Sequence, residues 1–219
     1  MTNAAAELVA SKPNVLLDFD GPICSVFGGV GADTAARQLR DRLGLSEQHS
    51  AEVRDPFEIL RYAAAEGQRE AIEAERELTK LEVEAVATAT PTPGAAELLR
   101  CLAGRGHRMA IVSNNSVAAV RAYLENHGLA GLVNEVSART DADPTRLKPG
   151  PYLLHQAFEQ LGVRPERCVM IGDSFADIQA AQVANVEIIA YANKPTKQDR
   201  FARYAPVTIV SDLYSLTVT

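Results

Sequence analysis

Two aspartates one residue apart, Asp18 and Asp20, close a short apolar run in the stretch NVLLDFDGP. Two more, Asp173 and Asp177, follow the apolar run VMIG further along the chain. Carboxylates that converge on one crevice repel one another and raise each other's pKa unless cations share the site. Oxygen ligation by a few carboxylates, completed by water and phosphate oxygens, is what Mg²⁺ prefers. The aspartates therefore indicate a site for Mg²⁺.

A lysine and a group of hydroxyl and amide side chains complete the candidate site. Ser113, Asn114 and Asn115 end the apolar run MAIV, and Lys148 precedes Pro149 after a polar loop. Each feature also has an ordinary structural explanation, since Ser-Asn-Asn suits a helix cap and a lysine before proline is usually solvated. Taken together, a metal ion, a lysine, a hydroxyl and helix N-termini form a site that holds a phosphate group.

Alternating apolar runs and helical patterns predict the elements that would position these residues. The strands that we expect are 15–19, 107–115, 132–138, 167–173, 186–191 and 207–213. Pro91 and Pro93 mark a connector, and the helices that we expect are one that runs from there to Gly104 or Gly106, 116–128, 150–162 and 174–184. This alternation predicts an α/β fold with a Rossmann-like, mostly parallel sheet covered by helices on both faces. Sites in such sheets form at the carboxyl ends of the strands, where the candidate residues stand.

A block between the first two strands has a different character, because it shows helical patterns and no strand pattern. Its helices are expected in DTAARQLRDRLGL, in DPFEILRYAAAEG and over about 69–88. The middle one has clear signals: Asp55 as cap, Pro56 in the first turn, Glu58 completing a capping box and Gly67 as the stop.

The chain therefore divides into two expected domains. We predict an all-helical cap over residues 25–91, inserted into a core made of residues 1–24 and 92–219. The cap carries 8 Lys and Arg against 13 Asp and Glu, so most of the acidic excess lies there. This excess disfavours a polyanionic substrate.

Composition and charge exclude several classes of function. The net charge of −6 and the pI of about 5.3 leave no broad basic surface for nucleic acid or an anionic membrane. The three cysteines form neither a disulfide framework nor a zinc motif. The N-terminal stretch has no secretory pattern, and no run is long enough to span a membrane. We expect a soluble cytoplasmic protein, and no pattern indicates its oligomeric state.

The ordered motifs resemble those of the haloacid dehalogenase (HAD) superfamily phosphatases. LLDFDGP is similar to the first motif, IVSNN to the second, Lys148 to the third and IGDSFAD to the fourth. The helical block resembles the cap that phosphoglycolate-phosphatase-like members insert between their first and second motifs. Any single motif is weak, but the ordered set with the insertion in this place is specific and covers the whole core.

This resemblance implies a magnesium-dependent phosphomonoester hydrolase that acts on a small phosphorylated metabolite. Asp18 would attack phosphorus and become an aspartyl phosphate, and Asp20 would act as general acid and then as general base. Ser113 and Lys148 would complete the catalytic set. The resemblance implies that the substrate-binding residues are Phe19, Ser113, Asn114 and Lys148. It implies that the residues for Mg²⁺ are Asp18, Asp20 through its backbone carbonyl, Asp173 and Asp177, the last through water or by orienting its neighbours.

Two other functions remain open at this point. A phosphomutase of the β-phosphoglucomutase type would need a cap acid-base, usually a histidine near a lysine, and His49 has no lysine beside it. A non-catalytic HAD-fold binding or regulatory protein would be expected to lack a motif residue, and every motif residue is present. One departure from many relatives is Pro22, where they have threonine.

The substrate is not encoded in a recognisable pattern. A sugar phosphate, phosphoglycolate or a nucleoside monophosphate would each suit the motifs. Arg37, Arg54 and Arg61 could meet an anionic substrate, although a surface or ion-pair role is the simpler interpretation of each.

Overall fold

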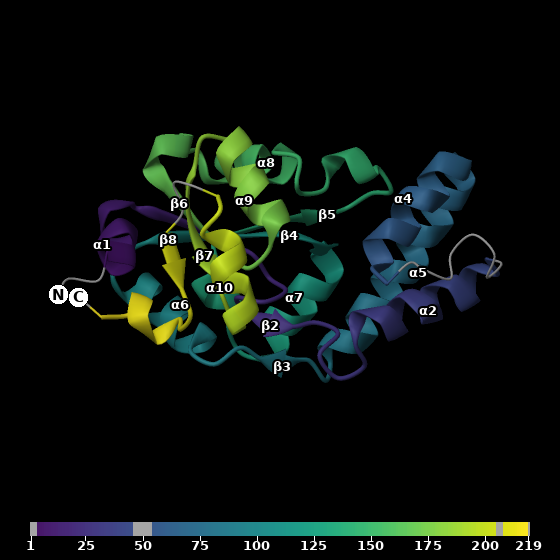
Figure 1. Cartoon of the computed structure of the whole chain (residues 1–219), viewed down its shortest axis with the longest axis horizontal. Coiled ribbons are helices and arrows are strands. Elements are labelled where there is room, and N and C mark those ends of the chain that lie inside the picture. The colour runs from purple at the N-terminus through teal and green to yellow at the C-terminus, as the bar shows by residue number, and fades with distance from the viewer. Residues whose placement is uncertain (1–3, 46–53, 205–207, 219) are drawn as a thin grey trace.

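The core of the chain is a six-stranded parallel sheet with the order β5-β4-β1-β6-β7-β8 (Figure 1). The computed structural model describes residues 4–45, 54–204 and 208–218. The strands are β1 (Asn14–Leu17), β4 (Arg108–Ser116), β5 (Glu135–Arg139), β6 (Cys168–Gly172), β7 (Glu187–Tyr191) and β8 (Thr208–Val210). The predicted Rossmann-like α/β core is confirmed. Because β1 lies between β4 and β6, the chain order reverses beside it, which is where sheets of this kind form a crevice.

Helices cover both faces of this sheet, and the alternation of side chains along β1 shows how. Val15 and Leu17 are buried in one apolar cluster, whereas Leu16 is buried in another on the opposite face. The first cluster is completed by α1 (Ala4–Ser11), α6 (Ala95–Gly104) and α7 (Val117–Asn126). The second is completed by α8 (Tyr152–Leu161), α9 (Phe175–Val183) and α10 (Pro195–Phe201). Single 3₁₀ turns are η1 (Ala130–Leu132), η2 (Pro144–Arg146), η3 (Pro165–Arg167) and η4 (Tyr214–Leu216).

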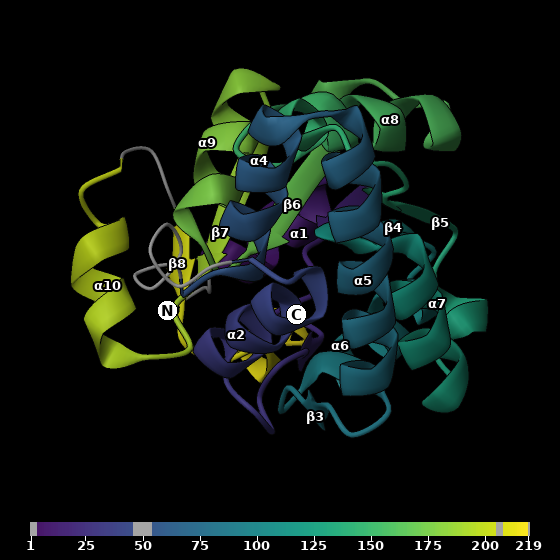
Figure 2. The same cartoon turned by 90° about the vertical axis from the view of Figure 1, so that its right-hand side faces the viewer.

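The described part of the inserted segment holds three helices, and Figure 2 shows them in front of the sheet. They are α2 (Ala32–Leu43), α4 (Pro56–Glu66) and α5 (Gln68–Val86). Their apolar faces meet in a third cluster that includes Leu39, Leu60 and Leu78. Leu147, which belongs to the loop after η2, is buried in the same cluster. The cap therefore has its own small core, and Leu147, which lies outside the inserted segment, helps to fill it.

A two-stranded antiparallel ribbon, which the sequence did not predict, joins the cap to the sheet. It pairs β2 (Cys24–Ser25) with β3 (Thr90–Pro91). Each strand has two residues, too few to produce an alternating pattern that could be recognised in the sequence.

Several helix and strand ends differ from the sequence prediction. β1 ends at Leu17 and not at Phe19, and α8 begins at Tyr152, so Lys148 lies in the loop before that helix. Ser116 caps α7 by accepting a hydrogen bond from the Ala119 amide.

The cap of α4 is only partly as predicted. Asp55 does cap the helix, and Gly67 does end it. The Asp55 carboxylate accepts a hydrogen bond from the Phe57 amide at 2.9 Å, one residue short of the Glu58 amide that a capping box uses. The predicted capping box at Glu58 is therefore wrong, because the short Asp side chain is already bonded at the second helical position.

No helix in the described parts of the chain is both long and apolar enough to cross a membrane.

We predict that Leu78→Ala destabilises the protein, because Leu78 is fully buried in the cap cluster. The free energy of unfolding in urea should fall by about 2–5 kcal/mol, the usual cost of a cavity left by leucine. Ile72→Ala is the control on the same helix, since Ile72 is 56% exposed. It should change the free energy by less than about 0.5 kcal/mol. Equal losses from the two variants would contradict this description of the cap core.

Candidate active site

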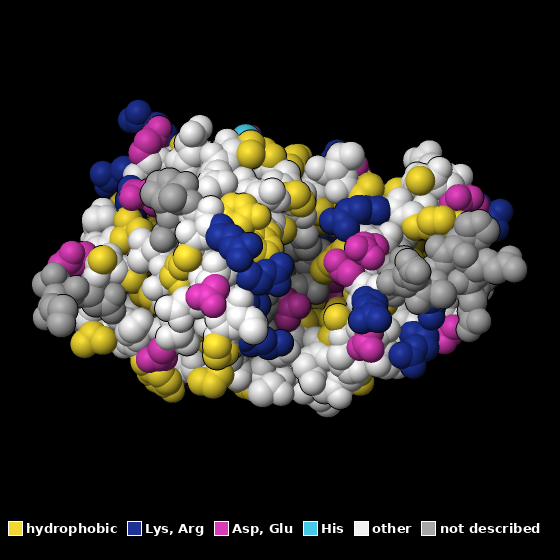
Figure 3. All heavy atoms as spheres, in the orientation of Figure 1, with side chains coloured by type: hydrophobic (Ala, Val, Ile, Leu, Met, Phe, Trp, Pro, Cys, Tyr) yellow, Lys and Arg dark blue, Asp and Glu magenta, His cyan; other side chains and the backbone are white. Residues whose placement is uncertain are grey.

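A cavity of about 290 Å³ lies between the carboxyl ends of the strands and helix α4 of the cap. Figure 3 shows a hollow between the two parts of the molecule, with acidic and basic side chains around it. The sheet side contributes Asp18, Asp20, Ser113, Asn114, Asn115, Lys148, Pro149, Asp173, Ser174 and Ala176. The cap side contributes Asp55, Phe57 and Arg61. The structure therefore gathers residues from all four sequence motifs around one cavity.

The ammonium group of Lys148 lies buried at the centre of this group. Its Nζ donates to Asp18 Oδ1 at 2.7 Å, to Asp177 Oδ1 at 2.6 Å and to the Val112 carbonyl at 2.8 Å. Burial alone would lower the pKa of Lys148, but the carboxylates of Asp177 and Asp18 outweigh it and raise that pKa overall. Lys148 is therefore a permanent cation with each of its three protons bonded.

Asp18 has one oxygen engaged and one available. Oδ1 accepts from Lys148 and from the Phe19 amide at 2.7 Å, whereas no described residue donates to Oδ2. Burial, followed by repulsion from Asp177, raises the pKa of Asp18 well above its ordinary value despite the neighbouring Lys148. The Phe19 ring is fully buried against Tyr123, so any contact of Phe19 with a ligand would have to come from its backbone.

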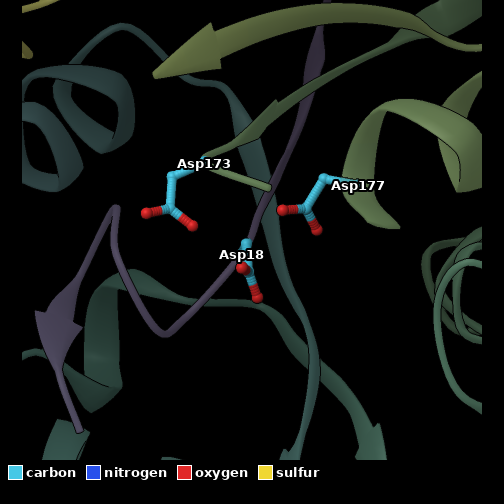
Figure 4. Close-up of side chains that lie close together, drawn as sticks. All are labelled: Asp18, Asp173 and Asp177. Atoms are coloured by element: carbon cyan, nitrogen blue, oxygen red, sulfur yellow. The ribbon is translucent and has the colours of Figure 1, made fainter. Parts of the chain in front are cut away.

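The carboxylates of Asp18, Asp173 and Asp177 face a common space (Figure 4), and one oxygen from each lies within 4.8 Å of the others. Asp173 Oδ2 accepts from Lys197 Nζ at 2.6 Å and from Asn193 Nδ2 at 3.2 Å, and no described residue donates to Oδ1. Burial raises the pKa of Asp173. The free oxygens of Asp18 and Asp173 and the excess of negative charge fit a Mg²⁺ ion.

Asp177 has both oxygens occupied by protein donors. Oδ1 accepts from Lys148, and Oδ2 accepts from the amide and hydroxyl of Ser174 at 3.0 and 2.6 Å. Ser174 and Asp177 form a capping box at the start of α9. Of the two roles that the family resemblance allows for Asp177, orientation of Lys148 and Ser174 suits these contacts better than metal binding through water.

Asp20 lines the same cavity but is more exposed than the buried carboxylates Asp18, Asp173 and Asp177. Its Oδ1 accepts from the Val26 amide at 2.9 Å. Desolvation by the surrounding protein raises the pKa of Asp20 to about 6, with a further contribution from Asp173, against the lowering effect of the Val26 hydrogen bond. A carboxyl group with this pKa can both give and take a proton near neutral pH.

The second motif forms a network of short polar contacts. The Asn114 side chain donates to the Lys148 carbonyl at 3.0 Å and accepts from its amide at 2.7 Å, so it holds the lysine loop. The Ser113 hydroxyl donates to the side-chain oxygen Oδ1 of Asn115 at 3.2 Å, and it accepts from the backbone amide of Asn115 at 3.2 Å. Asn115, for which the sequence predicted no separate role, thus lies beside the hydroxyl that is the candidate phosphate ligand.

Two basic residues gain significance from the structure. Lys197 lies on α10, a helix that the sequence analysis did not predict, and its ammonium also donates to the Asp173 carbonyl at 2.8 Å. The stretch NKPTKQDR after a predicted strand end was the available signal. Arg61 lines the cavity and has no ion-pair partner among the described residues. Arg37 and Arg54 are exposed and do not line it.

The chain combines a parallel sheet, acidic motifs at the carboxyl ends of its strands and a helical insertion after the first strand. This combination is typical of one class of hydrolases. The haloacid dehalogenase-like hydrolase family matches residues 14–185, well over half of the chain, and the chain belongs to this family. Its structure agrees, because a predicted phosphatase from Clostridium acetobutylicum superposes with a TM-score of 0.75 at 16% identity, over 94% of this chain and 96% of that one. This second likeness concerns the fold alone.

Curated relatives that are named phosphatases match only part of the chain. Phosphoglycolate phosphatase from Rhodospirillum rubrum is 33% identical over 114 residues, which cover 50% of this chain and 46% of that protein. Pyrophosphatase PpaX from Oceanobacillus iheyensis is 30% identical over 124 residues, which cover 57% of each protein. The chain spans about half the length of the curated relatives that it matches.

We predict that Gly21→Ala disrupts the candidate metal site. Gly21 has φ +119°, and a Cβ there would lie 2.2 Å from Asp173 Cγ. The methyl group should displace the Asp173 carboxylate and weaken Mg²⁺ binding at least about tenfold, as changes around metal ligands commonly do. Isothermal titration calorimetry with Mg²⁺ measures this effect.

Gly29→Ala is the matched control, because no atom would lie within 4 Å of its Cβ. Its Mg²⁺ affinity should equal that of the parent. Equal affinity in the Gly21 variant as well would show that Asp173 does not hold the ion.

Proposed function

We propose that this protein is a magnesium-dependent phosphomonoesterase that acts on a small phosphorylated metabolite through an aspartyl phosphate on Asp18. One observation carries the proposal: Asp18 has an unengaged oxygen on the cavity while Lys148 fixes the other oxygen. The raised pKa of Asp20 on the same cavity wall supports an acid-base partner for it. Residues 25–91 would act as the cap over this site.

In the first step, Asp18 Oδ2 attacks phosphorus and the bond from phosphorus to the ester oxygen breaks. Asp20 gives its proton to that oxygen, so the product leaves as a neutral alcohol. In the second step, Asp20 takes a proton from water, whose oxygen attacks phosphorus. Inorganic phosphate leaves and the Asp18 carboxylate is restored.

The remaining residues hold the phosphoryl group and balance its charge. The Ser113 hydroxyl would turn from Asn115 to donate to a phosphoryl oxygen, and Lys148 would offset the charge on Asp18. Asp18, Asp173 and the Asp20 carbonyl would hold Mg²⁺, which supplies charge stabilisation for the phosphoryl oxygens. Phosphoryl transfer needs mainly positioning and charge stabilisation, and these residues provide both.

The cavity supports a small substrate whose alcohol part carries a further anionic group. Its volume of about 290 Å³ suits a metabolite rather than a phosphoprotein. Arg61 is the basic side chain that the cap contributes to the lining. The names of the relatives, phosphoglycolate phosphatase and pyrophosphatase, support small anionic compounds. A panel of phosphate monoesters scored by phosphate release would identify the substrate.

A phosphomutase is the second candidate, and the cavity lining disfavours it. The described cap residues on the cavity are Asp55, Phe57 and Arg61, and none is a histidine. His49 lies outside the described residues. A mutase would release almost no inorganic phosphate, so measuring phosphate against substrate consumed separates the two functions.

We predict that Asp18→Asn abolishes turnover of p-nitrophenyl phosphate, because an amide cannot attack phosphorus. The rate should fall at least about a thousandfold, as expected for loss of a nucleophile. Circular dichroism should show the parent fold, since Asp177 and Val112 still hold Lys148. Hydrolysis at the parent rate by the folded variant would rule out the aspartyl phosphate.

We also predict that EDTA removes the activity and that added Mg²⁺ restores it, because Asp18 and Asp173 leave oxygens free for the ion. Phosphate release, assayed before and after chelation at constant ionic strength, measures this dependence. Undiminished activity in chelator would remove the metal from the proposed function.

A further inference from the structure

A fully buried carboxylate links the cap to the second motif. Glu82 lies on cap helix α5 and is 0% exposed. Its Oε1 accepts from Asn115 Nδ2 at 3.1 Å, and its Oε2 accepts from the Ser116 amide at 2.8 Å. The cap therefore contacts the two residues that directly follow Ser113 and Asn114.

Arg139, at the end of β5, supplies the charge that Glu82 needs. Its Nη2 donates to Glu82 Oε2 at 2.6 Å, and its side chain is 1% exposed. Its Nη1 donates to Glu75 Oε1 at 2.5 Å, and its Nε donates to the Asn114 carbonyl at 3.1 Å. One guanidinium thus joins two acidic residues of α5 to the backbone of the second motif.

The carboxylate of Glu82 determines how the Asn115 side chain is turned. A carboxylate only accepts hydrogen bonds, so the amide nitrogen of Asn115 must face it. The other end of the amide, Oδ1, then faces the Ser113 hydroxyl at 3.2 Å. A continuous chain of contacts therefore runs from Glu82 through Asn115 to the hydroxyl on the cavity wall.

We propose that Glu82 and Arg139 are positioning residues that make the phosphoryl-binding site depend on the docked cap. They hold Ser113, Asn114 and Asn115 in place to receive a phosphoryl group, so the site is complete only when α5 is seated. This inference rests on the proposed function, since it assigns the second motif to phosphoryl binding.

The chemistry of Glu82 and Arg139 favours a role in positioning the second motif over a role in merely holding the cap to the core. Two apolar side chains of similar volume often stabilise a buried contact as well as an ion pair, or better. Only an acceptor with two oxygens, however, can bind Asn115, Ser116 and Arg139 together. The network is thus suited to fixing directions, which an apolar contact does not do.

Glu82→Gln tests the inference with almost no change in size. If the glutamine nitrogen faces Ser116 and Arg139, those contacts break; if it faces Asn115, the Asn115 amide must flip and turn Nδ2 toward the Ser113 hydroxyl. The Kd for inorganic phosphate, measured by calorimetry in Mg²⁺, should rise at least about tenfold, and kcat/KM should fall by a similar factor. The matched control is Glu84→Gln on the same helix. Glu84 forms a solvent-exposed ion pair with Arg42. Both constants should stay within about twofold of the parent in this control.

A second variant separates positioning from stability. Glu82→Met with Arg139→Met replaces the buried ion pair by apolar side chains, and Glu75, which is partly exposed, keeps its hydrogen bond from Thr79. We expect a higher Tm than in either single variant, while the Kd for phosphate remains at least about tenfold weaker than in the parent. Parent-like phosphate affinity in the double variant, or in folded Glu82→Gln, would overturn the inference.

Phosphate binding is measured without turnover, so the two proposals fail differently. A parent protein that binds phosphate but hydrolyses no ester would overturn the proposed function. A parent that hydrolyses esters while Glu82→Gln equals it in kcat/KM and in phosphate affinity would overturn only the role of Glu82 and Arg139.

Discussion

The site is organised around one buried cation, the ammonium group of Lys148. An unpaired charge at this depth would be strongly unfavourable, so each of its protons must find an acceptor. The acceptors come from three parts of the fold: Asp18 after β1, the Val112 carbonyl in β4 and Asp177 on α9. Satisfying this single group therefore requires the strand order that brings those segments to one edge of the sheet.

The same requirement extends outward from Lys148. Two further carboxylates near the site have cations of their own, since Asp173 is paired with Lys197 and Glu82 with Arg139. These pairs tie three separate elements, α10, α5 and β5, to the strand ends. The cavity thus keeps acidic groups close together without their repulsion opening the fold, and Asp18 and Asp173 retain the oxygens that a divalent ion would use.

The core strands and the residues at their carboxyl ends could be predicted from the sequence, because both are encoded in short continuous stretches. Apolar runs such as MAIV and VMIG end in polar groups, and parallel strands carry those ends to one edge. The partners Glu82, Arg139 and Lys197 could not be predicted in the same way. Glu82 is one of many acidic residues on its helix. It is distinguished by contacts with Asn115, Ser116 and Arg139, which lie 33, 34 and 57 positions away in the sequence.

Leu147 gives the cap a second attachment, next to the buried lysine. Its side chain fills the cap cluster, while Lys148 belongs to the sheet edge. A chimera that exchanged residues 25–91 for the cap of another relative would leave this leucine facing an unmatched surface. A new cap grafted onto this core therefore needs to be transferred together with the loop 144–147. Leu147 and the apolar cluster that surrounds it would then come from the same protein.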